Sequence, residues 1–409
     1  MLRAVERLFP FRSMATAERS AALLMWLVGV FQGFAQSHAS ATVPFTRSAL
    51  GLTEGEMSLV LAVTRIAGFG ALAFTAWGDR RGRRLPFLVA FTLITGASLL
   101  TAFTTTPWQF AAAQGLLRIG SAAGGTLAVV LLAEAVAPRM RAFSLSLFGA
   151  GGSFGAGLAL LVLPLADLGP ESWRIPFALG GVGLAIVPFL ARRVGESAVF
   201  EEIRRGPRVR FVDLARGPFA ARFWPVSGAA LLAAAYTTVA LAFSTERLVG
   251  SLGLSTGTAV AVSLAGGTAG GIGFFVGGRL ADTLGRRIVS VGSLAVTTVG
   301  GVGLYWLTEL VVIVPAIAVS TFASFAYVPA AAAHRAELFP TEVRATAGAA
   351  AVYLGMVGSA LGLLIGRVTI DAFGLSETVT LLALGMIAAV WLTLLLPETR
   401  GQALDQVRT

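Results

Sequence analysis

Residues 278–287 read Gly-Arg-Leu-Ala-Asp-Thr-Leu-Gly-Arg-Arg, and a shortened copy, Gly-Asp-Arg-Arg-Gly-Arg-Arg, stands at residues 78–84. The aspartate of the copy, Asp79, recurs 203 residues later as Asp282, and the glycine and arginine pair recur at the same offset. Each string separates two long apolar stretches. Self-similarity at one fixed offset predicts that the chain consists of two related halves in the same orientation.

Further charged residues repeat at nearly the same offset. The repeated set is Asp79, Arg83, Arg84, Glu134, Arg141 and Glu196 in the first half, and Asp282, Arg286, Arg287, Glu337, Arg344 and Glu398 in the second. All follow apolar stretches, where helix ends carry unpaired backbone groups that charged side chains can satisfy. We expect them to hold neighbouring helices together in one conformer and release them in another; the alternative is that they anchor helix ends.

Composition indicates an integral membrane protein. Of 409 residues, 56% are hydrophobic and 13% charged, and the mean hydropathy is +0.80. A membrane crossing needs roughly 20 apolar residues. The spans that meet this length lie near 20–46, 57–78, 85–104, 108–134, 142–166, 174–191, 223–245, 256–278, 288–308, 310–333, 345–366 and 376–396. The predicted fold class is therefore all-α integral membrane, with twelve transmembrane helices in two six-helix bundles.

Arginine placement predicts the orientation. The basic residues are all arginine, and most of the 31 lie at the termini, in the loops after even-numbered spans and in the polar stretch 192–222. By the positive-inside rule these segments face the cytoplasm. We therefore expect a first bundle at 1–191, a cytoplasmic linker at 192–222 and a second bundle at 223–409, in the plasma membrane with both termini cytoplasmic.

Several other classes of protein are disfavoured. The net charge of +10 follows the membrane topology, so it predicts no nucleic-acid partner. The absence of cysteine excludes disulfides and thiolate metal sites, and we expect no metal and no cofactor. An apolar run from Ala21 with small residues at 39–41 also fits a signal peptide, but the first span has a counterpart at residue 223, which argues against cleavage.

The 278–287 string resembles the signature loop of the major facilitator superfamily, and the 78–84 copy stands where that family expects one. Further motifs are similar to those of its metabolite:proton symporter and sugar porter branches: 173–177, 196–200, 337–344 and 397–401. The resemblance implies two six-helix bundles, alternating access, a substrate site near the midplane and a monomeric transport unit. It also implies that the repeated charged residues form a cytoplasmic gating network.

Departures from that family pattern affect the expected coupling. Thr75 and Trp77 replace the leading glycine and the leucine of the first-half loop, and the first span reads Phe-Gln-Gly-Phe-Ala-Gln at 31–36 where many relatives carry a proton-coupling aspartate. No acidic residue lies near the middle of a predicted span. Proton coupling and facilitated transport therefore both stay open.

Charged and polar residues inside the spans are the substrate-site candidates. Arg65 and Arg118 lie within spans without an evident acidic partner, which is costly in a bilayer. A carboxylate substrate would satisfy them through paired hydrogen bonds, and the alternative is that nearby glutamines or carbonyls do so. The substrate-binding candidates are Gln32, Gln36, Arg65, Gln114, Arg118, Tyr236, Ser324 and Tyr327. His38 is expected to be an ordinary hydrogen-bonding residue.

The predicted function is a secondary active transporter that moves a small metabolite, an organic anion or a sugar-like compound, with or without protons. A facilitated uniporter and a drug or metabolite exporter of the same fold are the alternatives within the class. A membrane enzyme would need clustered catalytic acids, histidines or a metal site, which the spans lack. A transporter-like receptor without turnover would usually carry an added signalling domain.

Overall fold

The computed structural model describes residues 14–137, 140–196 and 211–400. All regular secondary structure in these ranges is helical, and twelve stretches are long and apolar enough to cross a membrane. These spans are Thr16–Ala41, Glu54–Gly78, Arg84–Thr101, Pro107–Ala135, Phe143–Asp167, Arg174–Arg193, Ala220–Ala242, Thr256–Leu284, Arg286–Trp306, Leu310–Leu338, Thr346–Phe373 and Leu375–Leu394. The predicted all-helical membrane fold is confirmed.

Contacts divide the chain into two compact units, which we call the first unit (Met1–Leu50 with Val63–Gly206) and the second unit (Gly51–Ala62 with Pro207–Thr409). The sequence-based boundaries at 191/192 and 222/223 stay predictions. The unit boundary falls within one helix, α4 (Glu54–Ala67), whose first nine residues are counted with the second unit. Residues 197–210 of the predicted linker lie outside the described ranges.

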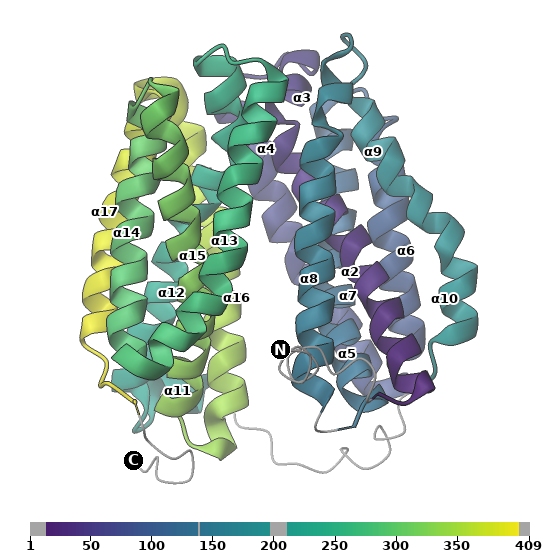
Figure 1. The fold of residues 1–409 in the computed structure, drawn as a ribbon, viewed down its shortest axis with the longest axis vertical. Coiled ribbons are helices and arrows are strands. Elements are labelled where there is room, and N and C mark those ends of the chain that lie inside the picture. Colours follow the sequence, from purple (N-terminus) through teal and green to yellow (C-terminus); the bar gives the residue numbers. More distant parts are fainter. Residues whose placement is uncertain (1–13, 138–139, 197–210, 401–409) are drawn as a thin grey trace, which may run out of the picture. The chain divides into compact units, whose positions relative to one another are not determined.

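The first unit contains most of the first six spans (Figure 1). Its helices are α2 (Thr16–Ala41), α3 (Val43–Ala49), the end of α4, η2 (Gly68–Gly70), α5 (Ala71–Arg81), α6 (Arg84–Thr101), α7 (Pro107–Ala135), α8 (Arg141–Leu161), η4 (Leu163–Asp167), α9 (Arg174–Gly180), η5 (Gly181–Ile186) and α10 (Val187–Arg193). The main pairs are α2 with α8 and α6 with α7. A 3-10 turn, η2, interrupts the second span between α4 and α5.

The second unit repeats this pairing (Figure 1). Its helices are α11 (Phe211–Arg216), α12 (Ala220–Ala242), the π-helical η7 (Glu246–Ser251), α13 (Thr256–Leu284), α14 (Arg286–Trp306), α15 (Leu310–Leu338), α16 (Thr341–Phe373) and α17 (Leu375–Leu394). Here α12 pairs with α16, and α14 with α15, as α2 pairs with α8 and α6 with α7 in the first unit. The repeat in the sequence therefore corresponds to a repeat in helix packing.

Glycine permits the tightest of these pairs. A Cβ atom added at Gly33 of α2 would clash with the Gly152 carbonyl of α8, and one added at Gly358 of α16 would clash with the Leu231 carbonyl of α12. Small residues let helix backbones approach closely, which gives packing energy where water cannot drive association. Equivalent helix pairs in both units are thus held by backbone-to-backbone contact.

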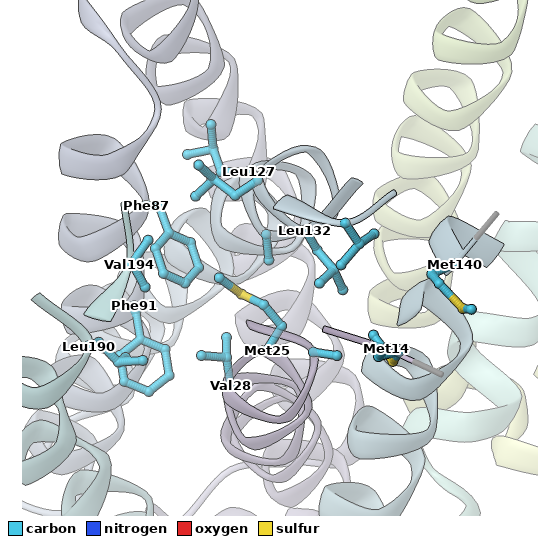
Figure 2. Close-up of a cluster of buried hydrophobic side chains, with 14 residues drawn as sticks. Met14, Met25, Val28, Phe87, Phe91, Leu127, Leu132, Met140, Leu190 and Val194 are labelled. Carbon is cyan, nitrogen blue, oxygen red and sulfur yellow. The ribbon is translucent and has the colours of Figure 1, made fainter. Parts of the chain in front are cut away.

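Apolar packing stabilises the end of the first unit where α2, α6, α7 and α10 meet. Figure 2 shows this cluster, which includes Met25, Phe87, Phe91, Leu132 and Leu190. These five residues are between 0% and 4% exposed. Close packing of this kind fixes the helix ends from which the repeated charged residues extend.

Candidate functional site

Two arginines lie inside the spans of the first unit, Arg65 on α4 and Arg118 on α7. Both are only partly exposed, and neither makes a hydrogen bond or ion pair with any described residue. The Arg118 guanidinium lies close enough to Arg65 for the two charges to interact. No described carboxylate pairs with either cation, and the role of both arginines stays a prediction.

An amide side chain contacts α7 close to Arg118. Gln32 of α2 donates from Nε2 to the Ser121 carbonyl at 3.0 Å, and its buried Oε1 receives no hydrogen bond from a described residue. Gln36, one turn further along α2, is partly exposed. Because α2 and α7 are packed together, this turn brings Gln36 toward the level of Arg118. The first unit thus contributes two guanidinium groups and two amides.

Two further first-unit candidates are occupied by structural contacts. Gln114 is 4% exposed and donates from Nε2 to the Thr101 hydroxyl at 2.9 Å, so it links α7 to α6. His38 is fully buried, 3.4 Å from the Ser98 hydroxyl and between the rings of Phe34 and Phe177. This environment agrees with the expectation that His38 has an ordinary structural role.

The second-unit candidates occupy two different environments. Tyr236 of α12 is 1% exposed and donates its hydroxyl to the Thr298 carbonyl of α14 at 3.1 Å. Ser324 and Tyr327, three residues apart on α15, are partly exposed. Neither of these two hydroxyls forms a hydrogen bond with a described residue. They are therefore available to a ligand, whereas the Tyr236 hydroxyl holds two helices together.

The repeated charged residues form a cluster at the α5–α6 loop of the first unit. Arg83 forms an ion pair with Glu134 through its guanidinium, and its backbone N–H donates to Glu196 at 2.7 Å. Arg84 donates to the Ala191 carbonyl at 2.5 Å. Arg141 donates to the Ala133 carbonyl at 2.7 Å. The side chain of Asp79, predicted to belong to this network, lies outside the described part of the structure.

A cavity of about 300 Å³ adjoins this cluster. It is lined by Glu134 and Glu196, by Arg193, and by apolar residues that include Met25 and Leu131. The Glu134 Oε2 atom is buried and accepts no hydrogen bond from a residue that the structure describes. Within the described ranges, one carboxylate oxygen of this cluster is therefore unsatisfied.

The matching cluster of the second unit has more contacts. Arg286 forms ion pairs with Asp282 at 2.9 Å and with Glu337 at 3.1 Å. Its backbone N–H donates to Glu398 at 2.8 Å, and that of Arg287 donates to the same carboxylate at 3.1 Å. All of these residues were predicted from the repeat, as was Arg344, which donates to the Phe339 carbonyl at 3.2 Å.

Burial and hydrogen bonds have opposite effects on the pKa of Glu398 in this second-unit cluster. Burial of Glu398 acts to raise its pKa, but the donating backbone N–H groups of Arg286 and Thr399 outweigh that effect, and the pKa lies below the ordinary value of 4.5. The Thr399 hydroxyl donates to Glu337 at 2.5 Å. The comparison of the halves marked the glutamates and also a hydroxyl residue after each of the last two, Ser197 and Thr399, but it did not predict which carboxylate the hydroxyl contacts.

A further polar cluster of the second unit was not predicted. Asp371 of α16 accepts hydrogen bonds from the Thr53 hydroxyl at 2.8 Å and the Gly55 N–H at 2.9 Å, and it pairs with Arg367 at 2.9 Å. The carboxylate therefore caps the first turn of α4, where it complements the helix dipole. The partners are more than 300 residues apart in the sequence, and no motif or spacing connects them.

Comparison with known proteins agrees with this architecture. The family model described as Major Facilitator Superfamily matches residues 25–363 and 226–408. The probable 4-methylmuconolactone transporter of Cupriavidus pinatubonensis is 28% identical over 87% of this chain and 85% of its own length. The gallate transporter of Pseudomonas putida is 26% identical over 90% and 89%. The crystal structure of a D-xylose-proton symporter superposes with a TM-score of 0.75 at 18% identity, covering 93% of this chain and 98% of the other.

The family match extends over both halves and spans the repeated loops from which the sequence resemblance was drawn. The related sequences are named as transporters, and the similar structure has the same two-bundle fold. This chain therefore belongs to the major facilitator superfamily, and it is a membrane transporter of a small metabolite and not an enzyme.

Proposed function

We propose that the transported metabolite is a small organic anion that carries a carboxylate, bound by Arg118. The observation that carries this proposal is the partly exposed Arg118 guanidinium, within a span and without a hydrogen bond or ion pair to any described residue. A charge in such a place is expensive unless it finds a partner. A carboxylate supplies that partner through two parallel hydrogen bonds, which a sugar hydroxyl cannot match.

The amides of Gln32 and Gln36 complete the proposed site in the first unit. The Gln32 Oε1 atom, which accepts no hydrogen bond, offers an acceptor to a hydroxyl group of the ligand. The proposed candidates of the second unit are Ser324 and Tyr327. A relative named as a gallate transporter supports a carboxylate as the class of substrate.

The repeated charged residues are proposed to gate the cytoplasmic side. Their positions at helix ends and their mutual ion pairs support this role. The arginine distribution supports cytoplasmic termini, on either side of a 192–222 linker that also faces the cytoplasm. We place the carrier in the plasma membrane as a monomer, because one chain contains both six-span halves.

The test is ligand-dependent thermal stability of the purified protein, followed by uptake into proteoliposomes. Benzoate, xylose and a quaternary ammonium compound serve as the anionic, neutral and cationic probes. We expect benzoate alone to raise the melting temperature, because a ligand that binds only the folded state stabilises it by mass action. Arg118→Gln should abolish the shift and Arg118→Lys should retain part of it. Stabilisation by xylose that Arg118→Gln leaves unchanged would contradict the proposal.

Uptake measured with and without an inwardly directed proton gradient distinguishes symport from facilitated transport. Position 32 carries glutamine, which cannot take up a proton in this pH range. Stimulation of uptake by the gradient would require a proton carrier elsewhere in the chain or on the substrate itself.

A further inference from the structure

The segments that carry the two partly exposed arginines run in the same direction and make contact at the end of α4 and at η2. A Cβ atom added at Gly115 of α7 would lie 3.0 Å from the Ala67 Cβ of α4, and one added at Gly70 would lie 3.0 Å from Ile119 Cδ1. Ala67 lies opposite Gly115 and Gly70 lies opposite Ile119, and these two contacts fix the register of the segments. The backbone of Arg65 is therefore displaced from that of Arg118 by about five residues, or roughly 7 Å along the helix axis. Two long side chains cover that separation easily.

At this separation the two guanidinium charges interact unfavourably. Like charges close together in a medium of low dielectric constant are costly, and proteins normally place a carboxylate between them. Among the described residues no carboxylate pairs with either arginine. The neighbouring side chains of Gln32 and Gln36 are neutral. The site thus carries a formal charge of about +2 that no described residue balances.

We infer that this site is built for a dianion, a compact dicarboxylate whose two carboxylates pair separately with Arg65 and Arg118. The inference rests on the proposed function and narrows it, because a monocarboxylate would satisfy Arg118 and leave Arg65 without a partner. A second carboxylate cancels the remaining charge and removes the repulsion at the same time. Arg65 is then the residue that sets specificity for ligand charge.

The test compares ligands of equal size that differ by one charge. Succinate is compared with succinamate, and phthalate with phthalamate, because each half-amide replaces one carboxylate by a neutral group of the same shape. Dissociation constants are measured on the purified full-length protein at neutral pH. We expect at least one diacid to bind about tenfold or more tightly than its half-amide, the ratio that corresponds to one well-formed charge pair.

Two substitutions of Arg65 locate the origin of that preference. Arg65→Gln should weaken the diacid to the level of its half-amide and change the half-amide by no more than about twofold. Arg65→Lys keeps the charge and should keep most of the preference. An unshifted melting temperature of the ligand-free variants serves as the folding control.

The outcomes separate the two proposals. Equal binding of diacid and half-amide by the wild-type protein overturns the dianion inference without any variant, and so does an Arg65→Gln variant that weakens both equally. In either case the proposed carboxylate transport stands if half-amide binding still requires Arg118. Absence of binding by every carboxylate probe overturns both.

Discussion

The charged clusters of the two units use the same residues but differ in how completely those residues are satisfied. In the second unit Arg286 contacts two carboxylates, and Glu337 also accepts a hydrogen bond from Thr399. In the first unit the Arg83 guanidinium contacts Glu134, which lines a cavity and whose second oxygen accepts no hydrogen bond from a described residue. Among the described residues, which leave out the Asp79 side chain and residue 197, the second-unit cluster is therefore the more completely paired.

Loss of the central arginine should give the largest difference between the clusters. Arg286→Ala leaves the nearly buried Glu337 without its cationic partner, which strongly destabilises a folded protein. We expect it to lower the apparent melting temperature at least as much as Arg83→Ala, because each arginine holds one nearly buried glutamate and Arg286 also pairs with the exposed Asp282. Thermal unfolding in detergent measures both effects.

The control for this pair is Arg279→Ala, which removes an exposed arginine from the end of α13. It should leave the melting temperature nearly unchanged, since exposed charges contribute little. Equal losses for Arg83→Ala and Arg286→Ala would show that the additional contacts of the second unit contribute no stability.

Substitution of the loop glycines Gly82 and Gly285 should destabilise the two units by similar amounts. Gly82 has φ 100° and Gly285 has φ 117°, and a Cβ atom at either would lie within 2.6 Å of a carboxylate oxygen, of Glu196 or Glu398. Gly82→Ala and Gly285→Ala should each cost about 1–3 kcal/mol through backbone strain. Similar shifts in melting temperature are expected, and a selective effect at one loop would mean that the two turns are not equivalent.

The Thr399 hydroxyl should contribute a smaller part of the free energy of unfolding. Thr399→Val keeps the shape of the side chain but removes the donor to Glu337, at a cost of about 1–2 kcal/mol. In a double-mutant cycle with Glu337→Gln, the two effects should not add, because both act on one hydrogen bond. Additive losses would indicate that Thr399 acts through packing alone.

Acid should weaken the second-unit cluster slightly through Glu398. Because its folded pKa is below the ordinary value, its stabilising effect is present above the unfolded pKa and is lost as the pH falls through the folded value. The difference in melting temperature between wild type and Glu398→Gln should therefore be larger at pH 7 than near pH 4. A difference that grows on acidification has the opposite sign and would contradict this assignment.

The sequence predicted those features that depend on local pattern. Long apolar runs gave the twelve spans, and the repeat placed Arg83, Arg286 and their glutamate partners in one set, because the same motif recurs at the same place in each half. Arg65 and Arg118 stood out because few acidic residues lie in the spans. Each of these features depends on local composition or on a fixed sequence repeat, so it can be read without knowledge of the folded structure.

Features set by packing between distant segments could not be predicted. The 3-10 turn at Gly68–Gly70 lies inside a continuous apolar run, and the sequence showed no interruption there. The burial of Tyr236 against α14 depends on which face of α12 turns inward, which the apolar pattern of a membrane helix does not show. The Asp371 contact joins segments whose proximity exists only in the folded chain.

The Asp371 contact has a consequence for expressing the protein as two separate fragments. Residues 51–62 are counted with the second unit, where Thr53 and Gly55 satisfy Asp371 and where the Ser58 hydroxyl donates to the Leu363 carbonyl at 2.7 Å. A C-terminal fragment produced alone from a break in the 192–222 stretch would lack this segment. Its Asp371 and its Leu363 carbonyl would then lose these hydrogen-bond donors, so the two fragments should be recovered in folded form only when they are co-expressed.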